Sequence, residues 1–233
     1  PAASAPMLLN RIQQTETLQT EGIYTHFARS DEPGDETTGI QLDRLEGLIS
    51  QLTAAGMRPK LIHAANSAGA LFHSRARRFD MVRAGIAIYG LAPAAQAPLP
   101  DGFRPVLSWK AGIISIQTFP EGQGISYGHR YHTRTSHEKI GVIPVGYADG
   151  FRRTAGNEVL VRGKRVPVVG TVCMDQCMIQ LDTVPEAQTG DEVVLIGRQG
   201  DQEISAEEVA ARWNTINYEV TSGISHRVDR IYR

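Results

Sequence analysis

The spacing of apolar residues in the first part of the chain predicts helices that alternate with strands. Residues 7–20 and 39–55 carry apolar side chains at helical intervals, and Gly56 is suited to end the second helix. A shorter helix is expected from Asn66. Strands that alternate with helices are typical of a parallel sheet. Runs rich in β-branched and aromatic residues predict these strands at 21–27, 60–65 and 80–84.

The pattern changes at a Pro- and Ala-rich stretch, 91–105, which we interpret as a linker. Beyond it, short apolar runs separated by Gly, Pro and Asp turns predict a mainly antiparallel β domain. One helix interrupts the strands, and Ser205-Ala-Glu-Glu208 is expected to begin it as a capping box. The fold class is therefore α/β followed by all-β, with domains 1–95 and 96–233. The strands of the second domain are expected at 106–118, 138–146, 158–162, 165–181 and 191–196.

Composition excludes some classes of function. The 233 residues suffice for two modest domains, and 24 basic against 25 acidic residues give a net charge of −1. Such a balance argues against a nucleic-acid partner or a membrane-surface partner. The short basic runs Arg75 to Arg78 and Arg152-Arg153 are interpreted as solvated or ion-pairing faces. No apolar run is long enough to span a bilayer, and the first residues lack a signal-peptide pattern.

Two cysteines, Cys173 and Cys177, are expected on one strand. Four residues of strand separate them by about 13 Å, which is too far for a disulfide. They are also too few for a structural zinc site, so we expect no metal. A reducing, cytoplasmic location fits best.

Polar side chains lie where each strand predicted in the first domain ends. His26 comes after IYT, Asn66 and Ser67 after HAA, and Arg83 after DMV, with Gly85 close behind. The carboxyl ends of parallel strands are where ligands bind, and glycine lets backbone N–H groups approach an anion. Each signal alone has a plain alternative, since a strand histidine can be a core residue and an Asn-Ser pair can be a helix N-cap. Together they favour a phosphate-bearing ligand.

Two tyrosines of the second domain are candidates for proton transfer. Tyr127 is expected in a tight Ser-Tyr-Gly turn, Tyr147 at the end of a strand, and Met174 and Asp175 in another strand. A phenol, with a reference pKa of about 10, becomes a usable base only where its neighbours favour the anion. Any one of these residues alone could equally be an ordinary residue of a β-rich core.

Many motifs in a fixed order resemble those of one enzyme family. In chain order they are YTHFARSDE, HAANSAG, VRAGIAIYGL, SYGHRY, IGVIPVGYADGF, VVGTVCMDQCMI, GDEVVLIG and TINYEV. Together they are similar to the C-terminal two-thirds of bacterial alanine racemase. The resemblance implies pyridoxal 5'-phosphate as cofactor and a TIM-type (β/α)8 barrel followed by a β domain. Residues 1–95 would be the C-terminal part of that barrel, and the tail from about 216 is expected to contact it.

The resemblance also implies roles for individual residues. Tyr127 would be a catalytic base, Arg83 would bond the pyridine nitrogen of the cofactor, and His26 would lie between them. Arginine stays protonated and cannot readily protonate the ring, so the carbanion should be short-lived and proton return favoured. Met174 would contact substrate through its backbone, and Tyr147 would narrow access to the site. The residues implied to line or hold the cofactor and its phosphate are Asn66, Ser67, Gly85, Ile86 and Tyr218.

One family feature has no counterpart in this sequence. The lysine that forms the Schiff base, and supplies the second base, belongs to the first barrel strand, and this chain starts beyond that point. Only the last three of eight barrel strands are represented, and such an open barrel would expose long edges. We therefore expect a companion N-terminal barrel segment to carry that lysine, and no activity from this chain alone. The lysines present lie in none of the matching motifs: Lys60, Lys110, Lys139 and Lys164.

The expected function is the interconversion of L- and D-alanine by two bases, supplying D-alanine for peptidoglycan. The expected assembly is a homodimer in which Tyr127 reaches the barrel of the second subunit. Three alternatives stay open: a serine or broad-specificity racemase, an inactive racemase-like fragment, and an interaction module. The SYG and CMDQ motifs disfavour a fold-related decarboxylase, and the β domain disfavours a pyridoxal-phosphate-binding barrel protein without catalysis.

Overall fold

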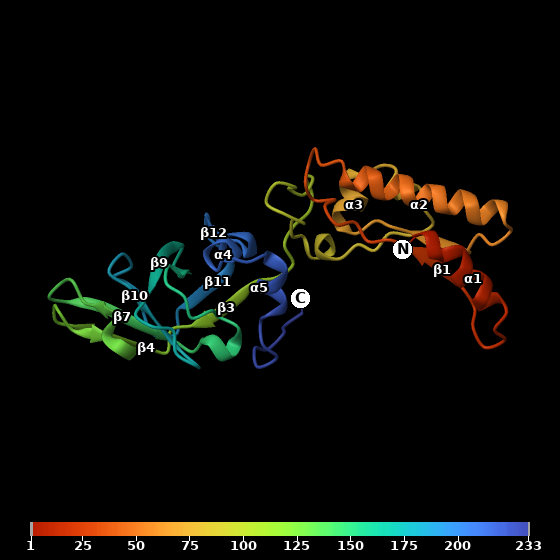
Figure 1. Ribbon diagram of the computed structural model, residues 1–233. Helices are drawn as coiled ribbons and strands as arrows, with labels where there is room; N and C mark the ends of the chain where they lie inside the picture. The colour runs from red at the N-terminus through yellow and green to blue at the C-terminus, as the bar shows by residue number, and fades with distance from the viewer. Residues whose placement is uncertain (1, 233) are drawn as a thin grey trace. The chain divides into compact units, whose positions relative to one another are not determined.

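The computed structural model describes residues 2–232 and divides the chain into two compact units, Pro1–Arg104 and Pro105–Arg233 (Figure 1). None of the helices in residues 2–232 combines the length and the apolar character that a membrane crossing requires.

The first unit contains helices and a small parallel sheet. Strand β1 pairs with β2, with Gly22 opposite Leu61 and Tyr24 opposite His63. The strand expected at 80–84 is reduced to one bridge between His63 and Met81. The elements are η1 (Ala2–Ser4), α1 (Ala5–Gln13), β1 (Gly22–Tyr24), α2 (Thr37–Ala54), β2 (Leu61–His63), α3 (Ser67–Phe72), η2 (Ala76–Arg78) and η3 (Ile86–Tyr89).

A side chain explains why residues 80–84 form no regular strand. The Asp80 carboxylate accepts the Ile62 N–H at 2.8 Å, where a backbone carbonyl would serve in a regular ladder. The segment still runs beside β2, because the Asp80 N–H donates to the Ile62 carbonyl at 2.9 Å and the Arg83 N–H donates to the Ala65 carbonyl at 2.8 Å. Arg83 is therefore held at the carboxyl end of β2.

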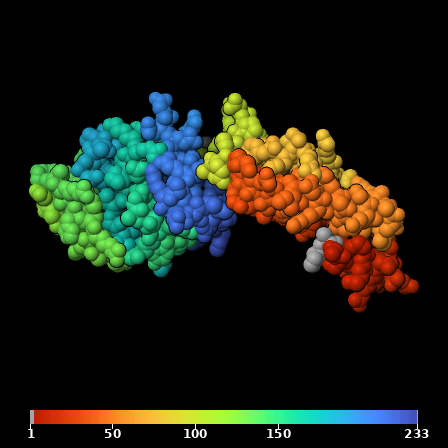
Figure 2. All heavy atoms as spheres, turned by 45° about the horizontal axis from the view of Figure 1, so that its top comes forward, coloured from red at the N-terminus to blue at the C-terminus, as the bar shows by residue number. Residues whose placement is uncertain are grey.

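Helix α2 covers the sheet, as its apolar stripe predicts. Leu42 and Leu45 pack with Phe27 and Ile62. Each fully buried leucine of this kind is worth about 1.5–3 kcal/mol relative to exposure. Figure 2 shows α1, in red, at one end of this unit, where Leu9 packs with α2 residues at the end of the same stripe. Gly56 ends the helix with φ of +69°, as expected.

The second unit is an antiparallel β structure, and this confirms the predicted fold class for that part of the chain. Its main sheet has the order β12-β11-β8-β9-β10-β7-β4, and β3 pairs with β11. The elements are β3 (Trp109–Gly112), β4 (Ser115–Phe119), β5 (Gly124–Ile125), η4 (Tyr127–His129), β6 (Tyr131–His132), β7 (Glu138–Ile143), η5 (Tyr147–Asp149), β8 (Glu158–Val161), β9 (Lys164–Val169), β10 (Cys177–Gln180), β11 (Glu192–Gln199), β12 (Gln202–Ile204), α4 (Ala206–Arg212) and α5 (Asn217–Ser222).

Two long strands expected from the sequence are each divided. Residues 106–118 contain β3 and β4, because the Ile113 N–H donates to Asp191 beside β11 whereas the Ile114 N–H donates to Val142 of β7. Residues 165–181 contain β9 and β10, separated by a turn that starts at Gly170 with φ of +71°.

The division of residues 165–181 corrects three expectations. Met174 and Asp175 lie in the turn between β9 and β10, and the two cysteines do not share a strand. Both cysteines are free, so the exclusion of a disulfide is confirmed. Cys177 is buried, and burial raises the pKa of its thiol to about 12.

The capping box at the start of α4 is half formed. The Ser205 hydroxyl accepts the Glu208 N–H at 3.1 Å, as predicted. The Glu208 carboxylate binds Arg165 and Arg212 at the surface of β9 and α4, so it is engaged away from the cap.

Candidate active site

Arg83 is the centre of a hydrogen-bonded cluster in the first unit. Its Nη1 donates to Nδ1 of His63 at 2.6 Å, and its Nη2 donates to Nδ1 of His26 at 3.1 Å. Nη2 also donates to the carbonyls of Thr25 at 3.1 Å and Ala64 at 3.3 Å. These bonds fix the guanidinium at the ends of β1 and β2. The sequence prediction placed His26 beside Arg83, and the two residues do lie together.

His63 and Tyr24 belong to this cluster but were not expected from the sequence. They face each other across β1 and β2, and their rings stack with centroids 5.2 Å apart and planes at 1°. The Arg83 guanidinium lies 5.1 Å from the centre of the Tyr24 ring, which adds a cation–π contact. A sequence signal existed, since each is the last residue of its strand, at the end that was searched for ligands.

The charge of Arg83 favours the neutral form of the His63 imidazole. Because Nδ1 accepts a hydrogen bond from a permanent cation, the imidazole is neutral and its proton lies on Nε2. Burial lowers the pKa of His63, and the positive charge of Arg83 lowers it further. Arg83 therefore remains the cation of the cluster.

Asn66 and Ser67 connect the start of α3 to neighbouring loops. The Asn66 carboxamide oxygen accepts the Gly69 N–H at 2.9 Å, so Asn66 is the helix N-cap that its sequence also suggested. The same oxygen accepts the Ser30 hydroxyl at 2.9 Å. Asn66 thus positions Ser67, which is only 5% exposed.

Ser67 forms a small cradle with the segment that begins η3. Its hydroxyl oxygen accepts the Gly85 N–H at 2.8 Å and the Ala87 N–H at 3.3 Å. Within residues 2–232 the Ser67 hydroxyl proton and the Ile86 N–H have no acceptor. A Cβ at Gly85 would contact only the Ser67 oxygen, at 3.8 Å, so the space beside these donors is open.

Tyr127 lies in a strained turn of the second unit. Ser126 before it has φ of +63° and Gly128 after it has φ of +71°. A non-glycine residue in such a conformation costs about 1–3 kcal/mol and persists only where its surroundings enforce it. Here the Ser126 hydroxyl donates to the Thr171 carbonyl at 2.6 Å, and the Thr171 hydroxyl donates to the Tyr127 carbonyl at 2.9 Å. The backbone is therefore pinned while the Tyr127 side chain is 71% exposed.

Tyr147 and Met174 are brought together by direct backbone bonds. The Tyr147 N–H donates to the Cys173 carbonyl and the Ala148 N–H donates to the Met174 carbonyl, both at 3.0 Å. A Cβ at Gly146 would lie 2.2 Å from the Met174 carbonyl oxygen, so only glycine permits this approach. The structure corrects one expectation here, since Tyr147 begins η5 and does not end a strand.

The candidate residues therefore form two groups. His26, Arg83 and the Ser67 cradle belong to the first unit. Tyr127, Tyr147 and Met174 belong to the second unit, where the segment that follows Gly170 contacts both tyrosine turns. Tyr218, on α5, is also in the second unit.

The cradle has the donors that a phosphate requires. A phosphate group accepts hydrogen bonds from hydroxyl and backbone N–H groups, and these are the groups that Ser67 and Ile86 present. The half-buried Arg83 guanidinium retains N–H groups for a ring nitrogen, because its Nη1 has a single protein partner among the described residues. The residues present fit pyridoxal phosphate.

Comparison with known proteins covers the whole chain. Residues 1–93 match the model of the alanine racemase N-terminal domain, and residues 106–232 match that of the C-terminal domain. An alanine racemase of Symbiobacterium thermophilum is 46% identical over 232 residues, which are 99% of this chain and 61% of that protein. One of Methanococcus maripaludis is 38% identical over 234 residues, or 62% of its length.

Solved structures agree with the sequence comparison. Alanine racemase from Bacillus anthracis with bound L-Ala-P has a TM-score of 0.89 and 43% identity, with 98% of this chain and 59% of that one covered. The enzyme from E. faecalis has a TM-score of 0.92 and 36% identity, with 100% and 62% covered. The chain thus spans about three-fifths of the length of its relatives. The resemblance in the sequence motifs is confirmed, and the chain belongs to the alanine racemase family.

Proposed function

We propose that these residues form the larger part of an alanine racemase that uses pyridoxal phosphate to interconvert L- and D-alanine and so supplies D-alanine for peptidoglycan. The observation that carries the proposal is the Arg83 cluster, in which two histidine Nδ1 atoms and two carbonyls orient a permanent cation. When bound, the cofactor would stabilise negative charge at the substrate Cα.

Arg83 would bond the ring nitrogen of the cofactor without protonating it. A guanidinium has a pKa above about 12, so it donates a hydrogen bond but holds its proton. By leaving the ring unprotonated, Arg83 would limit the electron withdrawal that the cofactor supplies. Return of the proton to Cα would then be favoured over transamination.

Ser67, Gly85 and Ile86 would hold the cofactor phosphate. The Ser67 hydroxyl and the Ile86 N–H supply donors, and the absence of a side chain at Gly85 leaves room for the phosphate oxygens. Asn66 acts indirectly, by capping α3 and fixing Ser67. Tyr218 would add a phenol from α5.

Tyr127 would move one of the two protons that racemisation requires. The pinned backbone and the exposed phenol suit a group that acts on a ligand bound outside its own unit. We propose that it reaches the Arg83 cluster of a second subunit, in a homodimer whose sites use both partners. Met174 would contact substrate through its N–H, since its carbonyl is taken by Ala148, and Tyr147 beside it would narrow access.

The second base would be a lysine from outside these 233 residues. Three of the four lysines present bind elsewhere in the second unit: Lys110 to Glu192 at 2.9 Å, Lys139 to the Pro185 carbonyl at 2.7 Å, and Lys164 to the Thr183 carbonyl at 3.0 Å. Lys60 immediately precedes β2, at the end opposite the Arg83 cluster. We therefore propose that these residues act with an N-terminal barrel segment and are inactive without it.

The test is racemisation by the complete enzyme that contains these residues. Arg83→Gln keeps a hydrogen-bond donor but removes the charge, and loss of one such preorganised group should lower kcat/KM by about 10²–10³-fold. Racemisation is followed by polarimetry of L-alanine. Arg44→Gln, at an exposed position of α2, is the matched control and should retain activity. Full activity in Arg83→Gln, or no alanine racemisation by the complete enzyme, would contradict the proposal.

A further inference from the structure

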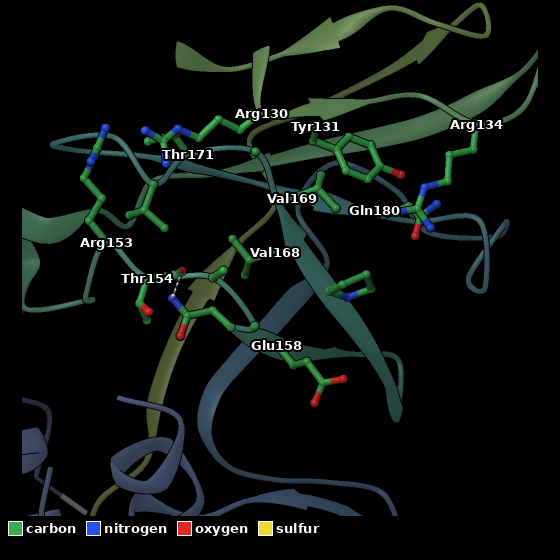
Figure 3. Close-up of a pocket in the computed structure, with 16 residues that line it drawn as sticks. Arg130, Tyr131, Arg134, Arg153, Thr154, Glu158, Val168, Val169, Thr171 and Gln180 are labelled. Carbon is green, nitrogen blue, oxygen red and sulfur yellow. Dashed lines mark hydrogen bonds between the residues drawn. The ribbon is translucent and has the colours of Figure 1, made fainter. Parts of the chain in front are cut away.

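A groove of about 550 Å³ lies on the second unit, and none of the residues given a role in the proposed active site lines it. Figure 3 shows Arg130 and Arg153 on the side of Thr171, and Arg134 with Gln180 on the other side. The volume is within the range of about 300–1,000 Å³ typical of small-molecule sites. Val168 and Val169 of β9 also line it.

The arginines of the groove have no carboxylate partner. Within residues 2–232, Arg130, Arg134 and Arg153 form none of the ion pairs, although arginine pairs are frequent elsewhere in this unit. The acidic residue of the lining, Glu158, is already bound by Arg165 at 3.3 Å and by Arg212. The groove therefore carries uncompensated positive charge.

Two other arginines of the basic runs are paired or packed. Arg75 pairs with Glu46 at 2.7 Å, and Arg152 pairs with Glu219 at 2.7 Å while lying 5.8 Å from the Trp213 ring. Both arginines fit the ion-pairing part of the interpretation given to the basic runs. Arg153 is exposed and forms no ion pair among the described residues, which fits the solvated part of it.

Buried groups hold both walls in place. Asn157 is 3% exposed, and its amide donates to the carbonyls of Arg152 at 2.9 Å and Thr154 at 3.4 Å, which fixes the loop carrying Arg153. On the other wall, buried Glu138 accepts the hydroxyl of Tyr131 and the N–H of Arg134, the latter at 2.6 Å. A groove with fixed walls loses little entropy when a ligand binds.

We propose that this groove binds a small organic anion with two negatively charged oxygens on one group, such as a phosphate monoester. The anionic group would lie between Arg130 and Arg153, with the Thr154 hydroxyl as a further donor. The carbon skeleton would pack on Val168 and Val169. This site does not depend on the proposed racemase function, although its Thr171 also bonds the Tyr127 carbonyl.

The experiment is calorimetric titration of the complete enzyme that contains these residues with phenyl phosphate, inorganic phosphate and phenol. Phenyl phosphate should bind saturably and most tightly, inorganic phosphate more weakly, and phenol not at all. Arg130→Gln and Arg153→Gln should each weaken binding about tenfold, because each removes one charge-assisted contact. Arg153→Lys retains the charge and should weaken binding less. Raising the ionic strength should also weaken it.

Two further variants locate the site. Arg198→Gln, whose side chain is 78% exposed and outside the groove, should leave binding unchanged. Arg134→Gln, on the far side of the groove, should have the smaller effect of the lining arginines. Absence of saturable binding would overturn the proposal, and so would Arg130→Gln and Arg153→Gln variants that bind phenyl phosphate as tightly as the unsubstituted protein. So would a change of oligomeric state in these variants without a change in binding, which would make the groove a protein interface.

Discussion

The hydrogen bonds of Arg83 fix which imidazole nitrogen of His26 and of His63 faces the guanidinium. The Nδ1 atoms of both imidazoles lie against the guanidinium, and His63, which accepts at 2.6 Å, keeps its proton on Nε2. The stacking of His63 on Tyr24 then orients Arg83 from the side of the sheet. The cation is thus positioned by two imidazole nitrogens and two carbonyls, and no carboxylate among these partners neutralises its charge.

This arrangement predicts a pH dependence of stability. His63 has its pKa lowered, first by burial and then by Arg83. Near pH 7.5 the imidazole is neutral in both states, but below about pH 6.5 the unfolded chain takes up a proton before the folded chain does. The free energy of unfolding should therefore fall as the pH decreases below that value.

Urea denaturation at about pH 7.5 and pH 5.5, followed by circular dichroism of the helices, measures the fall. His63→Gln should show a smaller fall than the unsubstituted chain. His137→Gln, at an exposed position, should show the same fall as the unsubstituted chain. An unchanged pH dependence in His63→Gln would contradict this account of the Arg83 cluster.

At the scale of elements, turns bring the candidate residues together. Gly146 allows the start of η5 to approach the turn between β9 and β10. A Cβ added at residue 146 would lie 2.2 Å from the Met174 carbonyl oxygen and 2.4 Å from the Cys173 carbonyl oxygen. Gly146→Ala should therefore separate Tyr147 from Met174. Because backbone must move, the cost should be about 2–4 kcal/mol of unfolding free energy.

Both tryptophans lie in the second unit, so their fluorescence during urea denaturation measures this cost. Gly112→Ala is the matched control, because its Cβ would meet only the Asp191 carbonyl at 4.0 Å. It should change the free energy by less than about 1 kcal/mol. If both substitutions lowered the free energy of unfolding equally, the close approach at Gly146 would not contribute to stability.

Elements that depend on residues close in the sequence were predicted correctly, whereas those that depend on residues far apart in the sequence were not. The apolar stripe of α2 and the stop at Gly56 are local, and the sequence predicted both. The breaks at Ile113 and Gly170 depend on which distant strand the chain pairs with next, so a continuous apolar run conceals them. His26 and Arg83 were found because polar residues at strand ends are conspicuous. His63 was missed because its role depends on Arg83, 20 residues away.

At the scale of the whole molecule, the proposed dimer makes each site from two subunits. An Arg83→Gln homodimer and a Tyr127→Phe homodimer should each be nearly inactive. Exchange of subunits between them would produce mixed dimers with one intact site and one doubly altered site. Random exchange in the complete enzyme should therefore restore about a quarter of the original sites.

Racemisation assays before and after subunit exchange measure this recovery. A mixture of Arg83→Gln with itself, taken through the same exchange, is the control and should stay inactive. Absence of recovery, with exchange verified by a tagged subunit, would place Arg83 and Tyr127 of one site in the same subunit.

The central claim is that Tyr127 removes the α-proton on one face of the substrate, and exchange of that proton with solvent deuterium tests it most directly. In the complete enzyme, Tyr127→Phe removes the phenol oxygen and keeps the ring. Exchange starting from L-alanine should fall by about 10²–10⁴-fold, the usual effect of losing a positioned acid–base group, while exchange from D-alanine should fall much less. Small and equal losses from both enantiomers would contradict the account and leave Tyr127 as a packing residue.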